Sequence, residues 1–370
     1  KHQYQKTGYF MSNTLKHLKE MISSSGLSGF ESPIREIISD AWEPYTDDLS
    51  VSKLGSLHGK LFGSGEEPRK SVMIATHMDA IGLIVTSVKN GFLYMDTLGG
   101  IDSRVLPGQM VVVHGEEEFP GMIIQPPDHA LPKENQSGPV PINRLLIDLG
   151  LEEREVAQKV KIGDLISFAT EPLELDGNYI AGHSLDNRAS VAVLTKTLEI
   201  LNKRQHLWDV FAVATTQEEE TLGGAATSGF ALRPTIAIVV DVTFAKSPGA
   251  PDHLSFEMDK GPTFDWGPNT HPKLFKSFEK VAKDFEYSYQ HAVYSRSSGT
   301  DAITLQLAGE GIPLMIVGLP LRYMHTPVEM IQIKDIERTA RLLADFISQL
   351  DDNFMDTLMW DAEKEEDEAK

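Results

Sequence analysis

The sequence contains no cysteine among its 370 residues. This absence excludes disulfide bonds and thiolate zinc sites, so any bound metal ion would have to use histidine and carboxylate ligands. A chain without disulfides is typical of the cytoplasm, and we predict a cytoplasmic location. No apolar run approaches the roughly 20 residues that a membrane-spanning helix needs, and residues 1–10 show no apolar signal-peptide core. We therefore expect no membrane partner; the sequence leaves open whether Met11 is the natural start.

Positive charge is also scarce. Thirty-four Lys and Arg residues stand against 54 Asp and Glu residues, which gives a formal net charge of −20. Phosphate binding needs a basic surface, so we expect no nucleic acid partner. An acidic surface instead attracts cationic ligands such as metal ions and free amino termini. Part of the acidic excess lies in DAEKEEDEAK (361–370), and we predict a disordered acidic tail over residues 351–370.

Short apolar runs alternate with helical patterns along most of the chain. The runs are rich in β-branched residues and do not alternate in polarity, which is typical of strands buried on both faces. They are SVMIAT (71–76), VFAVAT (210–215), TIAIVV (235–240) and IPLMIVG (312–318). Apolar residues at helical spacing predict helices over 187–204, 271–285 and 335–350. This alternation predicts an α/β fold with a mostly parallel sheet flanked by helices.

The stretch from 81 to 174 has a different composition. It is dense in short β-like pieces that are separated by Gly, Pro and Asn-Gly turns. We predict a small β-barrel or β-sandwich over residues 81–174, inserted into an α/β catalytic domain. That catalytic domain would comprise residues 14–80 and 175–350.

Histidine and acidic residues follow the ends of the predicted strands. Ligands of open parallel sheets bind beyond the carboxyl ends of the strands, so these side chains should meet at one edge. Asp186, at the start of the helix predicted over 187–204, is a further candidate. The residues that follow the four strands are His77 and Asp79, Glu218 and Glu219, Asp241, and His325.

Two imidazoles and three carboxylates from this set form a ligand group suited to Zn²⁺, Co²⁺ or Mn²⁺. Five protein ligands exceed the three of a typical catalytic zinc, but with one bridging carboxylate they suit two ions about 3.5–4 Å apart. Taken singly, each has an ordinary structural role; Asp186, for example, could be a helix N-cap. Five such groups at one sheet edge favour metal binding. They are His77, Asp186, Glu219, Asp241 and His325.

Nine motifs, in order along the chain, resemble one known family. The chain is similar to the tetrahedral (TET) aminopeptidases, dinuclear metallopeptidases that include glutamyl and deblocking aminopeptidases and CelM-like proteins labelled as cellulases. The resemblance covers roughly residues 14 to 350 and implies that the α/β fold is of the metallo-exopeptidase type. The motifs are SGLSGFES (25–32), ATHMDAIGLIV (75–85), LPGQMVVVHG (106–115), IDLGLEEREVA (147–157), GHSLDNRASVAVL (182–194), TTQEEETLGGA (215–225), VVDVT (239–243), SSGTDA (297–302) and RYMHTPVEMI (322–331).

The resemblance implies a division of the ligands between two metal ions. His77 and Asp241 would hold one ion, and Glu219 and His325 would hold the other. Asp186 would bridge the two. Each subunit would therefore bind two divalent ions, Zn²⁺ or Co²⁺, or else Mn²⁺.

The resemblance also implies catalytic roles and an assembly. Glu218 would be the general base, and Asp79 would orient His77. The inserted β domain would be a dimerisation domain, and the dimers would assemble into a hollow homododecamer. One departure lies beside the site, since the family usually has QEEVGLRGA where this chain has QEEETLGGA. The changed positions, which bear on substrate preference and metal affinity, are Glu220, Thr221 and Gly223.

We therefore predict a metallo-aminopeptidase that hydrolyses the N-terminal residue from peptides with a free amino terminus. A water activated by two metal ions would be the nucleophile, and Glu218 would be the general base. The same constellation leaves open an N-acyl deacylase or a carboxypeptidase. A glycosidase and a catalytically inactive assembly subunit are further alternatives. The preferred N-terminal residue, the native metal and the oligomer size stay open.

Overall fold

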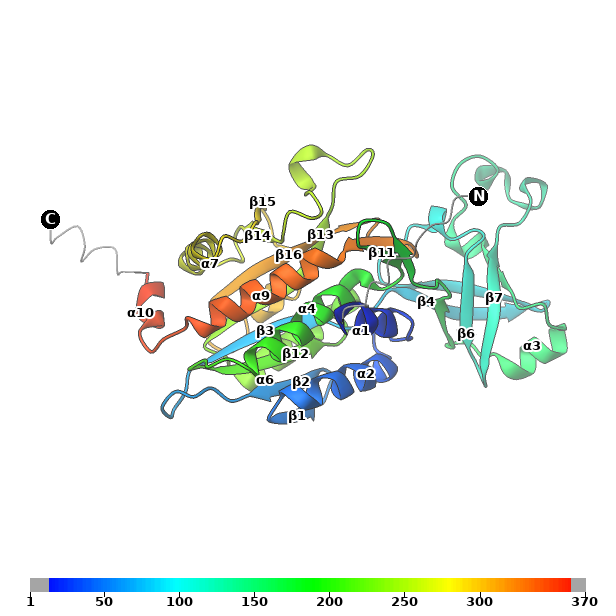
Figure 1. The fold of residues 1–370 in the computed structure, drawn as a ribbon. Coiled ribbons are helices and arrows are strands. Elements are labelled where there is room, and N and C mark those ends of the chain that lie inside the picture. The colour runs from blue at the N-terminus through cyan, green and yellow to red at the C-terminus, as the bar shows by residue number, and fades with distance from the viewer. Residues whose placement is uncertain (1–12, 361–370) are drawn as a thin grey trace, which may run out of the picture.

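Residues 13–360 are described by a computed structural model of the chain (Figure 1). Two bodies are visible: an elongated α/β domain built on one large sheet, and a small β-barrel that projects from one end of it. This arrangement confirms the predicted fold class, including the inserted barrel.

The large sheet has 11 strands, and its centre is parallel. The neighbours β12, β3, β13 and β16 all run in the same direction. The strands toward β1 and β10 pair antiparallel. A branch of the sheet adds β14, antiparallel to β16, and β15, parallel to β14. The strands are β1 (Asp48–Val51), β2 (Leu57–Leu61), β3 (Ser71–His77), β10 (Leu173–Leu175), β11 (Tyr179–Gly182), β12 (Asp209–Thr215), β13 (Ile236–Phe244), β14 (Thr263–Trp266), β15 (Gln290–Val293), β16 (Leu314–Arg322) and β17 (Glu329–Gln332).

Helices cover both faces of this sheet, which explains why its central strands are apolar throughout. In β3, Val72 and Ile74 point into one hydrophobic core, and Met73 and Ala75 point into a second core on the opposite face. Helices α6 and α8 pack on the second core. The described helices are α1 (Asn13–Ile22), α2 (Ser32–Trp42), α3 (Glu153–Lys159), α4 (Leu185–Leu201), α5 (Glu218–Thr221), α6 (Gly223–Leu232), α7 (Pro272–Asp284), α8 (Ala302–Leu305), α9 (Ile333–Ser348) and α10 (Phe354–Leu358).

Helix α4 lies in the middle of the larger core. It contacts β3 and β13 on one side and α1 and α9 on the other, so nearly its whole circumference is buried. A helix held on all sides is a rigid support, and its first turn lies at the carboxyl edge of the sheet beside Val240 of β13. The candidate ligand Asp186 belongs to that turn.

The barrel is closed by six antiparallel strands in the order β4-β5-β8-β7-β6-β9. Alternate residues point inward to a separate core, so Val111 and Val113 of β6 are buried whereas Met110 is exposed. The barrel strands lie inside the predicted range 81–174. They are β4 (Gly82–Lys89), β5 (Phe92–Leu98), β6 (Met110–His114), β7 (Glu118–Ile124), β8 (Leu146–Asp148) and β9 (Leu165–Phe168).

The segment 351–360 differs from the disordered tail that we predict from the sequence. It forms α10, whose Leu358 is buried, and the ring of Phe354 packs edge-on against Trp208 with centroids 5.9 Å apart. The Trp208 indole also donates a hydrogen bond of 2.9 Å to the carbonyl of Asp351. Apolar side chains within the acidic sequence thus fix this part. The remainder of the predicted tail, residues 361–370, and residues 1–12 lie outside the described residues.

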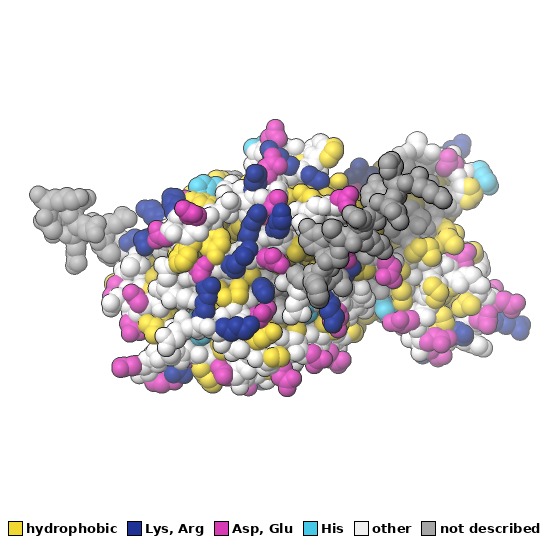
Figure 2. Space-filling view, in the orientation of Figure 1, with side chains coloured by type: hydrophobic (Ala, Val, Ile, Leu, Met, Phe, Trp, Pro, Cys, Tyr) yellow, Lys and Arg dark blue, Asp and Glu magenta, His cyan; other side chains and the backbone are white. Residues whose placement is uncertain are grey.

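Charges of both signs mix on the face seen in Figure 2. Lys and Arg side chains gather over its middle, in the region of α9, which carries Lys334, Arg338 and Arg341. Acidic side chains surround this region and dot the barrel. Within residues 13–360, none of the helices combines the length and apolar character that crossing a membrane demands.

Candidate metal centre

The predicted ligands lie at the carboxyl edge of the parallel strands. His77 is the last residue of β3, and Asp241 lies in the neighbouring strand β13. The register sets Val239 beside Ala75, which brings His77 and Asp241, two residues further on, next to each other. The next strand, β12, ends at Thr215 and leads directly into α5. Adjacent parallel strands thus deliver their side chains to one point, as the sequence predicts.

Asp186 is positioned by the irregular start of α4. Its φ and ψ of −79° and 105° are not helical. The next side chain, Asn187, donates a hydrogen bond of 3.0 Å to the carbonyl of Val240, which ties the helix start to β13. The backbone N–H of Asp186 donates to Oε2 of Glu329 at 3.0 Å. Both contacts hold the Asp186 carboxylate at the sheet edge.

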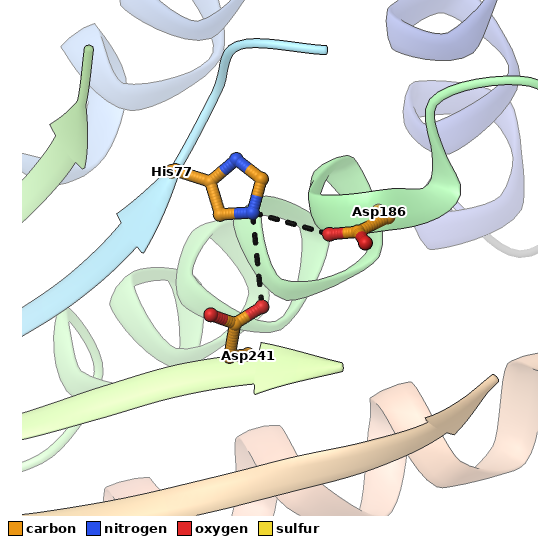
Figure 3. A group of neighbouring side chains, drawn as sticks. All are labelled: His77, Asp186 and Asp241. Atoms are coloured by element: carbon orange, nitrogen blue, oxygen red, sulfur yellow. Dashed lines mark hydrogen bonds and ion pairs between the residues drawn. The ribbon is translucent and has the colours of Figure 1, made fainter. Parts of the chain in front are cut away.

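His77, Asp186 and Asp241 form the first candidate metal-binding group (Figure 3). His77 Nε2 lies 3.1 Å from Asp186 Oδ1 and 3.7 Å from Asp241 Oδ1. All three residues are buried. Zinc–ligand bonds of about 2.0–2.1 Å place tetrahedral ligand atoms roughly 3.3 Å apart. The spacing of this group therefore fits one divalent ion.

Asp186, Glu219 and His325 form the second group. His325 Nε2 lies 3.4 Å from Asp186 Oδ2 and 3.5 Å from Glu219 Oε2. The two groups share Asp186, and each of its oxygens faces a different histidine. One carboxylate therefore stands between two sites with the ligand spacing of a divalent ion. All five predicted ligand positions lie in this one cluster.

The ionisation of the cluster reflects crowded negative charge. Burial raises the pKa of Glu219 to about 8, and the charge of Asp186 adds to this effect. Burial likewise raises the pKa of Asp241 to about 7. Burial also acts on Asp186, but hydrogen bonds from His325 and His77 outweigh it and lower its pKa. The hydrogen bond with Asp186 raises the pKa of His325 to about 9. Protons thus neutralise charge that divalent cations would otherwise offset.

Glu218 lies beside both groups without belonging to either. Its Oε2 is 3.9 Å from His77 Nε2, and its side chain lines the same cavity. Burial raises its pKa to about 10; His77 opposes this shift, and Asp241 and Asp301 reinforce it. A carboxyl group in this place can exchange a proton with a molecule in the cavity.

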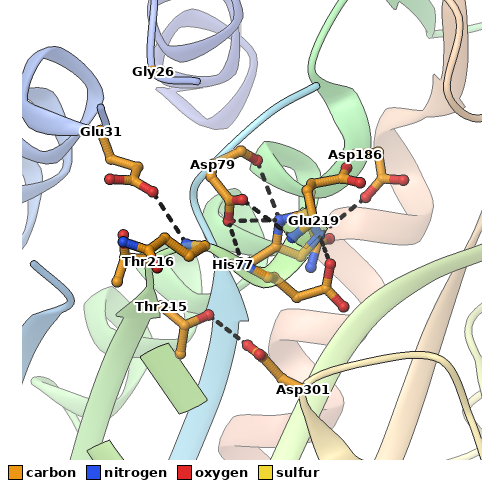
Figure 4. Close-up of polar contacts among 12 residues, drawn as sticks. Gly26, Glu31, His77, Asp79, Asp186, Thr215, Thr216, Glu219 and Asp301 are labelled. Carbon is orange, nitrogen blue, oxygen red and sulfur yellow. Dashed lines mark hydrogen bonds and ion pairs between the residues drawn. The ribbon is translucent and has the colours of Figure 1, made fainter. Parts of the chain in front are cut away.

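Asp79 connects the histidine to the start of α5. It is fully buried, and its two oxygens accept the backbone N–H groups of Glu218 at 3.0 Å and Glu219 at 3.2 Å (Figure 4). The Asp79 carbonyl lies 3.1 Å from His77 Nδ1, the ring nitrogen that faces away from the cluster. Asp79 therefore fixes the orientation of the imidazole and the position of both glutamates.

Comparison with known proteins identifies the family. Residues 55–342 match the family model described as M42 glutamyl aminopeptidase. The chain belongs to this family.

Relatives share the fold over nearly the whole chain. The chain is 32% identical to a lysyl aminopeptidase of Pyrococcus furiosus, over 90% of this chain and 96% of the relative. A TET aminopeptidase from the marine sediment archaeon Thaumarchaeota archaeon SCGC AB-539-E09 superposes with a TM-score of 0.88 at 30% identity, covering 94% and 99% of the two chains. The Pyrococcus horikoshii TET1 peptidase, described as able to form a tetrahedron or a large octahedral shell, gives a TM-score of 0.80 at 28% identity, covering 91% and 100%. The chain is thus a peptide hydrolase of the aminopeptidase class.

The M42 fold also brings two acidic residues to the site that do not follow the strand-end pattern. Glu329 is buried and accepts the backbone N–H groups of Asp186 and His325, both at 3.0 Å. Asp301 is buried and accepts the hydroxyl of Thr215. Glu329 lies four residues after His325 in RYMHTPVEMI, and Asp301 lies in SSGTDA, so both motifs contain a signal that the strand-end argument does not use.

A cavity of about 440 Å³ opens over the metal-binding groups of this M42 chain. The barrel contributes one wall through the turn at Gly99 and Gly100. Gly99 donates its N–H to Oε1 of Glu220 at 2.6 Å. A Cβ at Gly100 would lie 3.0 Å from His325 Nδ1, so glycine permits the close approach of this turn. Glu220 therefore connects the barrel to the edge of the site.

Proposed function

We propose that the chain is a dinuclear metal-dependent aminopeptidase that removes the N-terminal residue from peptides with a free amino terminus. One observation carries the proposal: Asp186 turns one oxygen toward His77 and the other toward His325, at 3.1 and 3.4 Å. A carboxylate shared by two ligand groups is the arrangement expected of a pair of co-catalytic ions. The ligand chemistry suits Zn²⁺, Co²⁺ or Mn²⁺.

The five ligands divide naturally between two ions. His77 and Asp241 would hold one ion, Glu219 and His325 the other, and Asp186 both. When bound, two divalent ions would polarise the scissile carbonyl and lower the pKa of a water at the site.

The chain's own groups supply the proton transfers. Glu218 accepts a proton from the attacking water, whose oxygen bonds to the scissile carbonyl carbon. When the C–N bond breaks, Glu218 returns that proton to the leaving amine. Asp79 keeps Glu218 in place through the backbone hydrogen bond of 3.0 Å. The peptide's α-ammonium group is attracted by the acidic cluster, which favours exopeptidase action.

The alternatives fit the site less well. A carboxypeptidase needs a cation for the substrate's terminal carboxylate, and no Lys or Arg of the described chain lines the cavity. An N-acyl deacylase would not use the attraction between the acidic cluster and an α-ammonium group. Glycosidases use a pair of carboxyl groups without metal ions, whereas the cavity's carboxylates cluster with two histidines. An inactive subunit would not be expected to keep a full ligand set.

The barrel is the proposed dimerisation domain of a homododecamer. Met110 and Met122 lie opposite each other on β6 and β7 and are 52% and 46% exposed, and Ile162 is 70% exposed. Exposed apolar side chains on a small barrel are typical of a subunit interface. The proposal rests on these residues together with the shells reported for the P. horikoshii relative. Light scattering of the purified chain tests it, because a monomeric mass would contradict it.

Reconstitution with metal tests the activity. The chain is stripped with a chelator, dialysed, reloaded with Zn²⁺, Co²⁺ or Mn²⁺, and incubated with one peptide in free and N-acetylated forms. We expect loss of activity after chelation, recovery with metal, and cleavage of the free peptide only. Cleavage of the acetylated form, or full activity in the chelator, would contradict the proposal.

A further inference from the structure

The residues that line the cavity beside the metal ligands are positioned to contact the side chain of the substrate's first residue. Besides four neutral polar side chains, they include four apolar ones that the preceding argument does not use. The apolar residues are Leu222, Val242, Phe244 and Met324.

Two of the apolar residues adjoin ligands in sequence. Val242 follows Asp241 directly, and Met324 precedes His325. Phe244 lies two residues beyond Val242 at the end of β13 and is 58% exposed. The exposed ring of Phe244 beside the cavity offers apolar surface that a bound substrate can bury.

The charged groups around the cavity disfavour a charged side chain on the first residue of the substrate. Among the described residues no Lys or Arg lines it, so no basic side chain of the protein would pair with an acidic substrate side chain. Each carboxylate that lines it is a proposed metal ligand or Glu218, so none is left over to pair with the side-chain ammonium group of a lysine at the first position. They are Asp186, Glu218, Glu219 and Asp241.

We infer that this enzyme prefers peptides whose N-terminal residue is uncharged and apolar, of the size of leucine or methionine. The inference rests on the proposed aminopeptidase function and specifies the substrate of that same site. It differs from the glutamyl name of the family and from the lysyl name of the P. furiosus relative. The side chain of the N-terminal residue packs against Val242, Phe244 and Met324, while the scissile carbonyl faces the metal ligands.

The expected preferences follow from burial and charge. A leucine side chain buries about three more carbons than alanine, which corresponds to about a tenfold gain in kcat/KM after partial exposure. Placing an unpaired charge in the cavity lowers kcat/KM by about 30-fold or more relative to leucine.

A panel of peptides that differ only at the first residue tests the inference. The full-length, metal-loaded chain is given peptides beginning with Leu, Met, Ala, Glu or Lys, and kcat/KM is measured for each. We expect Leu and Met to exceed Ala, and Ala to exceed Glu and Lys. A preference for Glu or Lys would overturn the inference and leave the aminopeptidase function standing. Failure to cleave any of these peptides would overturn the proposed function itself.

A charge introduced at the cavity edge provides a second test. Phe244→Lys places a cation beside the substrate side chain, and the exposure of Phe244 makes the change tolerable for folding. We expect the ratio of kcat/KM for Glu over Leu to rise by about tenfold. The matched control is Phe285→Lys, at a phenylalanine that is 48% exposed and does not line the cavity. Equal ratios in the two variants would overturn the inference.

Discussion

Glu218 differs from its neighbour Glu219 in what it contacts. Glu219 joins Asp186 and His325 in a metal-binding group, whereas Glu218 belongs to neither group and faces the cavity. Glu218→Gln should therefore keep the fold and both metal sites but lower kcat by about 10²–10⁴-fold, because an amide cannot accept the water's proton. Single-turnover kinetics and metal analysis of the same preparation measure both effects.

The control for this variant is Glu219→Gln, which changes a proposed ligand. It should lower the metal content at one site as well as the rate. A Glu218→Gln enzyme with unchanged kcat would contradict the assignment of Glu218 as the general base.

Glu329 holds the backbone of two proposed metal ligands, Asp186 and His325. Its carboxylate accepts the N–H groups of Asp186 and His325, one with each oxygen. Glu329→Gln keeps the shape but leaves one of these N–H groups facing an amide NH₂. We expect metal affinity to fall by about 10–100-fold, measured by competition with a chromogenic chelator. Saturating metal should restore most of the rate, and unchanged affinity would contradict the supporting role.

At the level of single residues, the sequence predicts those positions that follow a buried strand. His77 and Asp241 are such cases, because consecutive apolar residues identify the strand and the parallel register then sets its end at the sheet edge. Glu329 begins an antiparallel strand, and Asp301 lies in a loop before a short helix. Only the packing of distant segments brings these two to the site, so the strand-end argument could not find them.

Between elements, α5 contacts the turn of the barrel at Gly99. Glu220 accepts the N–H of Gly99 at 2.6 Å. Glu220→Val removes the acceptor, so the amide of Gly99 should exchange about fivefold faster with deuterium. KM should rise more than kcat falls, because the turn forms a wall of the cavity while the proton-transfer groups are untouched. Glu220→Gln keeps an oxygen acceptor and is the control; identical exchange in all three proteins would contradict the contact.

Helices are predicted correctly where a long stripe of apolar residues is buried. A short helix that depends on a few contacts with distant residues is missed. The helices predicted over 271–285 and 335–350 appear as α7 and α9, because each shows a long apolar stripe. Helix α10 is short and lies within an acidic stretch, so its order depends on contacts such as Phe354 with Trp208 that the sequence does not reveal.

For the whole molecule, the crowded acidic cluster makes stability depend on pH when metal is absent. Folding raises the pKa of Asp241 from 3.8 to about 7 and that of Glu219 from 4.5 to about 8, mainly through burial. The folded state then holds more protons than the unfolded state, so its stability falls as pH rises toward these values. The opposite effect of His183, whose pKa burial lowers from 6.5 to about 3, ends near pH 6.5.

We therefore expect the chelated protein to become less stable between about pH 6.5 and 8. Its free energy of unfolding should fall by about 1.4 kcal/mol per pH unit for each extra proton that the folded state holds, and its melting temperature should fall with it. Bound metal displaces these protons, so the loaded protein should show a flatter or opposite trend. Thermal denaturation at matched ionic strength measures both forms. Parallel pH profiles would contradict the electrostatic account of the cluster.

Anomalous diffraction from crystals of the zinc-loaded protein tests the central claim most directly. The account predicts two peaks about 3.5–4 Å apart in each subunit, one on each side of the Asp186 carboxylate. One peak lies beside His77 and Asp241, and the other beside Glu219 and His325. A single peak, or two peaks that do not share Asp186, would contradict it.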